Sequence, residues 1–201
     1  MAIKVANNQS LTAITALPSA VSGGAMTLLE TQTASGSATL SFTSNIDDTY
    51  DEYVFKFYDI HPATDQAYLT FQGNAAGGSG YNETITSTDF RAYHGETDDA
   101  TALQYSAAFD QAQGTSFQPI TQEIGNDNDQ SAVGTLHLFN PSSTTFVKHF
   151  ISTTQYSWSA DYSMRDFTAG YFNTTSAIDE IQFKMSTGNM DAGVIKLYGI
   201  S

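Results

Sequence analysis

The run Glu52-Tyr53-Val54-Phe55-Lys56-Phe57-Tyr58 decides the fold, because apolar and polar side chains alternate along it. Side chains of a β-strand point to opposite faces with a period of two. Tyr53, Phe55 and Phe57 therefore share one face, and the charged Lys56 falls on the other. The run predicts a strand with one buried and one solvated face.

Similar short runs recur along the rest of the chain. They lie at residues 38–43, 68–71, 89–94, 135–139, 145–152, 178–185 and 192–200. The side chains expected to point inward are Leu40, Phe42, Leu136, Leu138, Ile181, Phe183, Ile195 and Leu197. Turn-forming clusters separate the runs, at His61-Pro62 and at residues 45–51, 74–80, 125–130, 140–144 and 186–193. This spacing predicts an all-β fold, an antiparallel β-sandwich of jelly-roll type. Residues 102–112 are the best helix candidate.

Composition limits the classes of function. The chain of 201 residues carries 7 basic and 21 acidic residues, a net charge of −14. Nucleic acids and anionic membranes attract clustered Lys and Arg, so neither is expected as a partner. The chain has no cysteine, which excludes disulfides and thiolate metal sites. The length suits one well-buried domain.

The first residues differ from the rest. Residues 3–24 are small, polar and nearly uncharged, and they show no strand or helix period. We expect an extended N-terminal anchoring arm over residues 1–25 and a sandwich domain over residues 26–201; a disordered tail is the alternative. The possible anchoring residues are Ile3, Val5, Leu11, Ile14 and Leu17. Because no signal peptide or membrane-spanning run is present, synthesis in the cytoplasm without standard export is expected.

Motifs for catalysis or metal binding are weak. The acidic cluster 47–52 is typical of a solvated turn, and residues 126–129 lack the glycine and glutamate of a calcium loop. The Gly-rich stretch 74–81 lacks the Lys-Ser/Thr of a phosphate loop. The four histidines have no metal-type spacing, although His137 and His149 are expected to face outward. We therefore expect no enzyme activity, cofactor or metal, but a spatial pair of carboxylates stays open.

Aromatic residues crowd the segment from 156 to 172. Exposed aromatics with polar neighbours form sugar-stacking surfaces or subunit interfaces, whereas buried ones close a core. Both interpretations stay open here. The candidate glycan or interface aromatics are Tyr156, Trp158, Tyr162 and Tyr171.

Four segments, taken in order, are similar to a known group of proteins. They read SNIDDTYDEYVF (residues 44–55), IHPATD (60–65), LFNPSST (138–144) and IQFKMSTGNMDAGVIKLYGI (181–200). Together they resemble small virion structural and tail-fibre-like proteins of tailed bacteriophages, especially marine and cyanobacterial ones. The resemblance spans residues 28–201, and the last segment is its most specific part.

The resemblance implies a non-enzymatic protein on the surface of the virion, as a tail-fibre or spike component or a capsid decoration protein. The N-terminal arm would dock onto capsid or tail proteins, and a homotrimer is expected by analogy with other fibres and protrusions. The alternative is a carbohydrate-binding module for host attachment that contacts a host surface glycan. A polysaccharide-degrading enzyme is a third hypothesis.

Overall fold

The computed structural model describes residues 25–201, and in this part of the chain every regular element is a β-strand. The strands are β1 (Met26–Thr33), β2 (Leu40–Phe42), β3 (Glu52–Pro62), β4 (Leu69–Ala75), β5 (Ile85–Gly95), β6 (Thr101–Tyr105), β7 (Ala112–Gly114), β8 (Gln118–Pro119), β9 (Ala132–Phe139), β10 (Lys148–Trp158), β11 (Tyr162–Phe172), β12 (Ile178–Met185) and β13 (Met190–Ile200). No helix in the described residues is long and apolar enough to cross a membrane.

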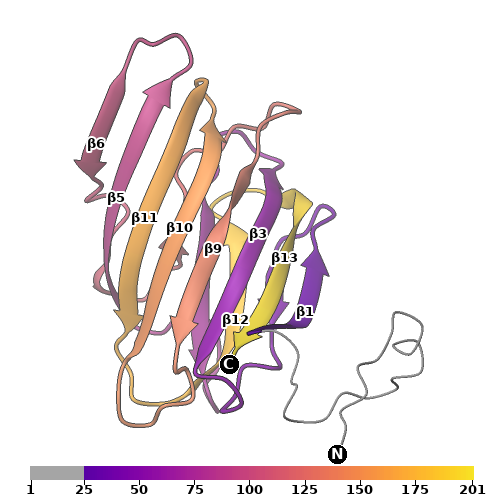
Figure 1. Cartoon of the computed structure of the whole chain (residues 1–201), viewed down its shortest axis with the longest axis vertical. Helices are drawn as coiled ribbons and strands as arrows, with labels where there is room; N and C mark the ends of the chain where they lie inside the picture. Colours follow the sequence, from indigo (N-terminus) through magenta and orange to yellow (C-terminus); the bar gives the residue numbers. More distant parts are fainter. Residues whose placement is uncertain (1–24) are drawn as a thin grey trace, which may run out of the picture.

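The strands form two antiparallel sheets. Sheet A has nine strands in the order β1-β13-β3-β9-β10-β11-β5-β6, with β7 also paired to β5; sheet B has four, in the order β2-β12-β4-β8. Figure 1 shows sheet A in front, with β12 of sheet B behind it. The all-β sandwich predicted from the alternating runs is confirmed.

The strand pairing is that of a jelly roll. β1 pairs with β13, β2 with β12, β3 with β9, and β4 with β8, so the pairs are nested like a long hairpin folded over on itself. Along the chain these eight strands alternate between the two sheets, except that β4 and β8 follow each other in sheet B. The jelly-roll topology expected from the sequence is therefore present.

Two insertions widen sheet A beyond sheet B. One brings β5, β6 and β7 between β4 and β8, and the other brings the β10–β11 hairpin between β9 and β12. They add β10, β11, β5 and β6 to one side of sheet A (Figure 1). Residues 106–124, which include the two-residue strand β8 at the edge of sheet B, contact the inner side of this extension through bonds such as Thr154 Oγ1 to the Ile120 carbonyl at 2.5 Å.

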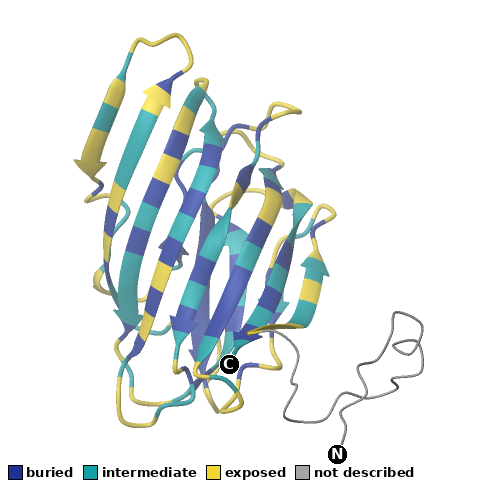
Figure 2. Ribbon diagram, viewed as in Figure 1, coloured by how far each residue is buried: buried dark blue, intermediate teal, exposed yellow. Residues whose placement is uncertain are grey.

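Aromatic side chains fill the space between the sheets. Phe55 of β3 meets Phe183 of β12 edge-to-face at 5.2 Å, and Phe71 of β4 meets Phe150 of β10 at 5.0 Å. Burying each such ring contributes roughly 1.5–3 kcal/mol. The inward residues predicted from the alternating runs are all buried, and Figure 2 shows the resulting stripes of buried and exposed positions.

Some local expectations were wrong. Residues 102–112 form no helix; they contain most of β6, a turn closed by Phe109 N–H to the Ser106 carbonyl at 2.9 Å, and the start of β7. The first part of this segment lies at the edge of sheet A, where β6 pairs with β5. His61-Pro62 is the end of β3 rather than a turn. β1 and β11 were not predicted, and β10 begins at Lys148 and runs on to Trp158.

Candidate functional site

A small aromatic hollow lies on the inner side of the sheet A extension. Its walls come from three neighbouring strands and one loop, and its volume is about 200 Å³. The lining residues are Arg91 and Tyr93 of β5, Trp158 of β10, Tyr162 and Met164 of β11, and Ala100 of the β5–β6 loop. Strand register explains why they meet, since Trp158 pairs with Tyr162 and Met164 pairs with Tyr93. We call it the aromatic pocket.

Carboxylates hold the two main rings of the pocket in place. The Trp158 indole N–H donates to Glu123 Oε2 at 2.6 Å, and the Tyr162 hydroxyl donates to Asp99 Oδ2 at 2.9 Å. The bond from Tyr162 lowers the pKa of Asp99 and raises that of the Tyr162 hydroxyl. The two rings meet edge-to-face at 5.0 Å, and Tyr93 lies 5.9 Å from Tyr162. The pocket is thus preorganised.

Arg91 forms one wall of the aromatic pocket, and the side-chain amides of two glutamines hold its guanidinium in place. Its Nη1 donates to Gln122 Oε1, and the Gln104 carboxamide, with its oxygen toward the guanidinium, accepts two N–H groups at 2.7 and 2.9 Å. A guanidinium has five N–H donors, so two remain for a ligand. Arg91 forms no ion pair within the described residues, and its guanidinium lies 5.7 Å from the centre of the Tyr93 ring.

A buried polar network lies behind Arg91. Asp166, the β11 partner of Arg91, accepts a hydrogen bond from the Tyr156 hydroxyl at 3.0 Å, and Asp89 accepts one from Thr168 at 2.6 Å. Both carboxyls are only 1% exposed, and each keeps one oxygen without a partner. Burial, and then repulsion from Asp89, raise the pKa of Asp166 to about 7. Burial also raises the pKa of Asp89.

The opposite face of sheet A, here the outer face, is the second feature. Large apolar side chains are exposed at nine positions of the described residues, and eight of them lie on this face; Phe146 is the exception. Their shared side follows from the strand register. The eight are Met26, Leu28, Tyr58, Phe90, Leu103, Tyr105, Val133 and Ile151. Leu103 is 72% exposed and Ile151 50%.

The outer face also differs in charge from the rest of the chain. Its regularly paired positions carry Lys56, Lys196 and Arg165, but one carboxylate, Glu52. Glu52 Oε1 lies 2.6 Å from Nδ1 of His137. A face with more cations than carboxylates is unusual in a chain of net charge −14.

An apolar hollow of about 440 Å³ indents the outer face. Phe139, His149, Ile151, Gly170 and Tyr171 are among the residues that line it. A Cβ at Gly170 would come within 2.8 Å of the Phe150 ring, so glycine lets that ring pack beneath the hollow. The outer face therefore offers an apolar, indented surface.

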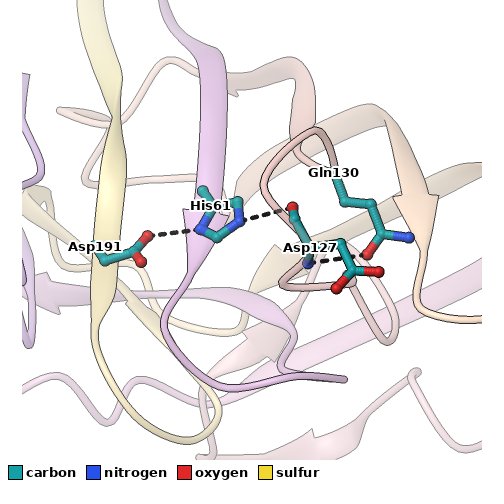
Figure 3. A network of polar contacts seen from close by, with 4 residues as sticks. All are labelled: His61, Asp127, Gln130 and Asp191. Atoms are coloured by element: carbon teal, nitrogen blue, oxygen red, sulfur yellow. Dashed lines mark hydrogen bonds and ion pairs between the residues drawn. The ribbon is translucent and has the colours of Figure 1, made fainter.

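A third cluster joins three segments at His61 (Figure 3). Its Nδ1 lies 2.7 Å from Asp191 Oδ1, and its Nε2 lies 3.1 Å from the Asp127 carbonyl. Both partners are acceptors, so the ring makes both bonds as the doubly protonated cation. Burial opposes this charge, but the bonds to Asp191 and Asp127 raise the pKa of His61 overall. With both nitrogens engaged, His61 clamps β3, β13 and the 125–131 loop together.

The other motifs noted in the sequence lie in turns and loops of the fold. Asp47 accepts hydrogen bonds from the Thr49 N–H at 2.8 Å and the Tyr53 hydroxyl at 2.9 Å, so the acidic cluster includes a turn cap. Residues 126–129 form the loop beside His61. Within residues 25–201, no three His, Cys, Asp or Glu side chains are grouped as a metal site requires. His137 and His149 face outward, as predicted.

The four aromatics predicted from the sequence separate into three places. Trp158 and Tyr162 meet in the aromatic pocket, Tyr156 is buried in the core, and Tyr171 lies on the outer face against His149. Sequence reasoning missed Tyr93 and Arg91, which lie on β5 and join the pocket through strand pairing. The predicted anchoring residues Ile3, Val5, Leu11, Ile14 and Leu17 lie outside the described residues.

Comparison of the chain with protein-family models, curated proteins and solved structures finds no match. Its function must therefore be inferred from its own residues and geometry.

Proposed function

We propose that this chain is a non-enzymatic structural protein of a bacteriophage virion, displayed on the particle surface. It would serve as a tail-fibre or spike component or as a capsid decoration protein. In this proposal, residues 1–25 anchor the jelly roll to capsid or tail proteins, and the protein is made in the host cytoplasm before assembly. The resemblance of the segments at 44–55 and 181–200 to virion proteins supports this assignment.

The observation that carries the proposal is the outer face of sheet A. Monomeric soluble proteins rarely expose large contiguous apolar surface, and patches of this kind mark interaction sites. Eight large apolar side chains and an apolar hollow share this face, and carboxylates are depleted there. Aromatic residues, Met and Arg are enriched, and Asp and Glu depleted, in protein interfaces.

The fold agrees with this role without specifying it. Jelly rolls occur in viral capsid and lectin domains, but a fold by itself does not determine function. The partners proposed are other copies of this chain, a homotrimer being favoured, and other virion proteins. The net charge of −14 argues against nucleic acid as a partner.

The arm's role can be tested on particles. Phage would be grown with the full chain or with residues 26–201 alone, and quantitative mass spectrometry of purified particles would give the copy number of each. We expect the truncated protein to melt cooperatively by circular dichroism but to be depleted at least about tenfold from particles, as loss of an anchor predicts. Normal incorporation of a folded, truncated protein would show that the arm is no anchor.

A further inference from the structure

We propose that the aromatic pocket binds a neutral hexopyranose ring, such as one residue of a surface glycan. This inference goes beyond the structural role proposed above and does not depend on it. It uses a different face of sheet A from the outer face, since Tyr162 points into the pocket and Tyr171 of the same strand points outward.

The size and the walls of the pocket suit one sugar ring. Pockets for drug-sized ligands usually occupy about 300–1,000 Å³, and this one, at about 200 Å³, is smaller. A pyranose has an apolar face of C–H groups and a polar rim of hydroxyls. Half-buried Trp158, Tyr162 and Tyr93 line the pocket, where their rings can pack against the C–H groups.

Fixed polar groups at the pocket match sugar hydroxyls. Glu123 and Asp99 accept bonds from the rings and retain further acceptor sites for hydroxyl donors. Arg91 retains two N–H donors for hydroxyl or ring oxygens. Because neighbouring side chains hold these groups in place, little side-chain entropy would be lost on binding.

The charges around the pocket favour a neutral ligand. Asp99 and Glu123 adjoin the rings, and the chain is strongly acidic overall. A carboxylate on the sugar would meet repulsion from these groups, which offsets its attraction to Arg91. A cationic ligand fits no better, since the Arg91 guanidinium already lies beside the Tyr93 ring.

Trp158 supplies the measurement, because it is the single tryptophan of the chain. The full protein would be titrated with the methyl α-glycosides of glucose, mannose and galactose while its fluorescence is recorded. We expect at least one glycoside to change the emission saturably, with a Kd on the order of 1 mM. No saturable change with any of the three would overturn the proposal. Tighter binding of methyl glucuronoside than of methyl glucoside would overturn the assignment of a neutral sugar.

Variants on one strand provide a matched comparison. Tyr162→Ala removes a pocket wall and should weaken binding about tenfold or more, as loss of a stacking ring predicts. Tyr171→Ala removes the same side chain from the outer face of β11 and should leave binding unchanged. Equal binding by Tyr162→Ala and the wild type would overturn the proposal. Should Tyr162→Ala fail to fold, Ala100→Phe fills the pocket from its loop without adding a second tryptophan and must abolish binding.

Discussion

Asp166 shows how a single buried residue can set the pH dependence of stability. Burial and the neighbouring Asp89 raise the pKa of Asp166 to about 7, against an ordinary value of 3.8. Between these two values the folded chain keeps a proton that the unfolded chain releases. Stability therefore falls as pH rises from about 4 to about 7, because the unfolded state binds fewer protons there. Each pKa unit corresponds to about 1.4 kcal/mol, so the ionisation of Asp166 costs on the order of 4 kcal/mol.

Asp166→Asn should remove this cost. The amide oxygen can still accept the hydrogen bond from the Tyr156 hydroxyl, but it carries no charge at any pH. We expect the variant to be more stable than wild type, and the difference to grow from about 1 kcal/mol at pH 5 to about 4 kcal/mol at pH 8. Urea denaturation at both pH values would measure the change. Asp48→Asn, in an exposed turn, is the control, and a difference that does not grow with pH would contradict the prediction.

His61 also makes the folded chain more stable at lower pH, through the positive charge of its protonated ring. Its pKa is raised, so its protonated form stabilises the fold, and this contribution is complete below its unfolded pKa of about 6.5. The contribution is lost as pH rises through the higher folded pKa. His61 and Asp166 thus both favour the folded chain under mildly acidic conditions. Only the contribution of Asp166 is absent from Asp166→Asn, so comparison of this variant with wild type separates the two.

At the scale of elements, the sequence predicted those strands whose inner face is apolar. Phe55, Leu136, Phe183 and Leu197 all lie where the period of two placed them, because the two sheets bury them against each other. The jelly-roll class followed from the same alternation and the spacing of the turns. The pairing between distant strands could not be predicted, because the hydrophobic period alone does not indicate which strands are neighbours.

The β10–β11 hairpin shows why β11 was missed. Along one row of inner positions, Phe55 and Leu136 are followed on the next three strands by Ser152, Thr168 and Asp89. The polar three are buried and hydrogen-bonded on the sheet A extension, which residues 106–124 cover in place of the long strands of sheet B. Polar residues on both faces remove the apolar alternation, so β11 could not be predicted from its pattern.

The candidate site was predictable to the same limited degree. Trp158 and Tyr162 stand out in the sequence as aromatics with polar neighbours, and they flank the β10–β11 turn, so their proximity is local. Tyr93 and Arg91 come from a strand about seventy residues earlier. They reach the pocket through the pairing of β5 with β11, which is a tertiary property.

One buried amide ties both ends of the first insertion to β4. Gln72 Nε2 lies within 3.0–3.2 Å of the carbonyls of Glu83, Thr115 and Ser116, and its Oε1 accepts the Gly73 N–H at 2.8 Å. Gln72→Met keeps the length of the side chain but leaves these groups without their partner. Unsatisfied buried polar groups cost about 1–3 kcal/mol each.

We expect Gln72→Met to lower the free energy of unfolding by about 2–4 kcal/mol and to loosen the insertion first. Hydrogen exchange should accelerate around residues 83 and 115–117 before it does in β3 and β13. Gln155→Met, on the outer side of β10, changes the same side chain at a partly exposed position and is the control. Uniform acceleration across both sheets would contradict the local role of Gln72.

At the scale of the whole molecule, the two sheets differ in width, and both proposed surfaces follow from that difference. Nine strands face four, so part of sheet A extends past its partner. The inner side of that extension carries the aromatic pocket, and its outer side continues the apolar outer face. β11 contributes to both, with Tyr162 on one side and Tyr171 on the other. One widened sheet could thus bind a ligand and pack against a partner at the same time.

Self-association through the outer face is the test of this arrangement. Ile151 lies in the middle of sheet A and is half exposed, so an aspartate there should leave the isolated chain folded while charging the interface. By native mass spectrometry we expect the wild type to form a species of three copies of the 21.7 kDa chain, and Ile151→Asp to be a monomer with an unchanged cooperative melt. Ala76→Asp adds the same charge in the exposed loop that follows β4 and should keep the assembly. The outer face carries three cations, Lys56, Lys196 and Arg165, but one carboxylate, whereas the rest of the chain is acidic. Contact between the outer face of one copy and the acidic surface of a neighbouring copy should therefore weaken as the salt concentration is raised. A monomeric wild type, or an Ile151→Asp variant that assembles normally, would mean that copies of this chain do not pack through the outer face.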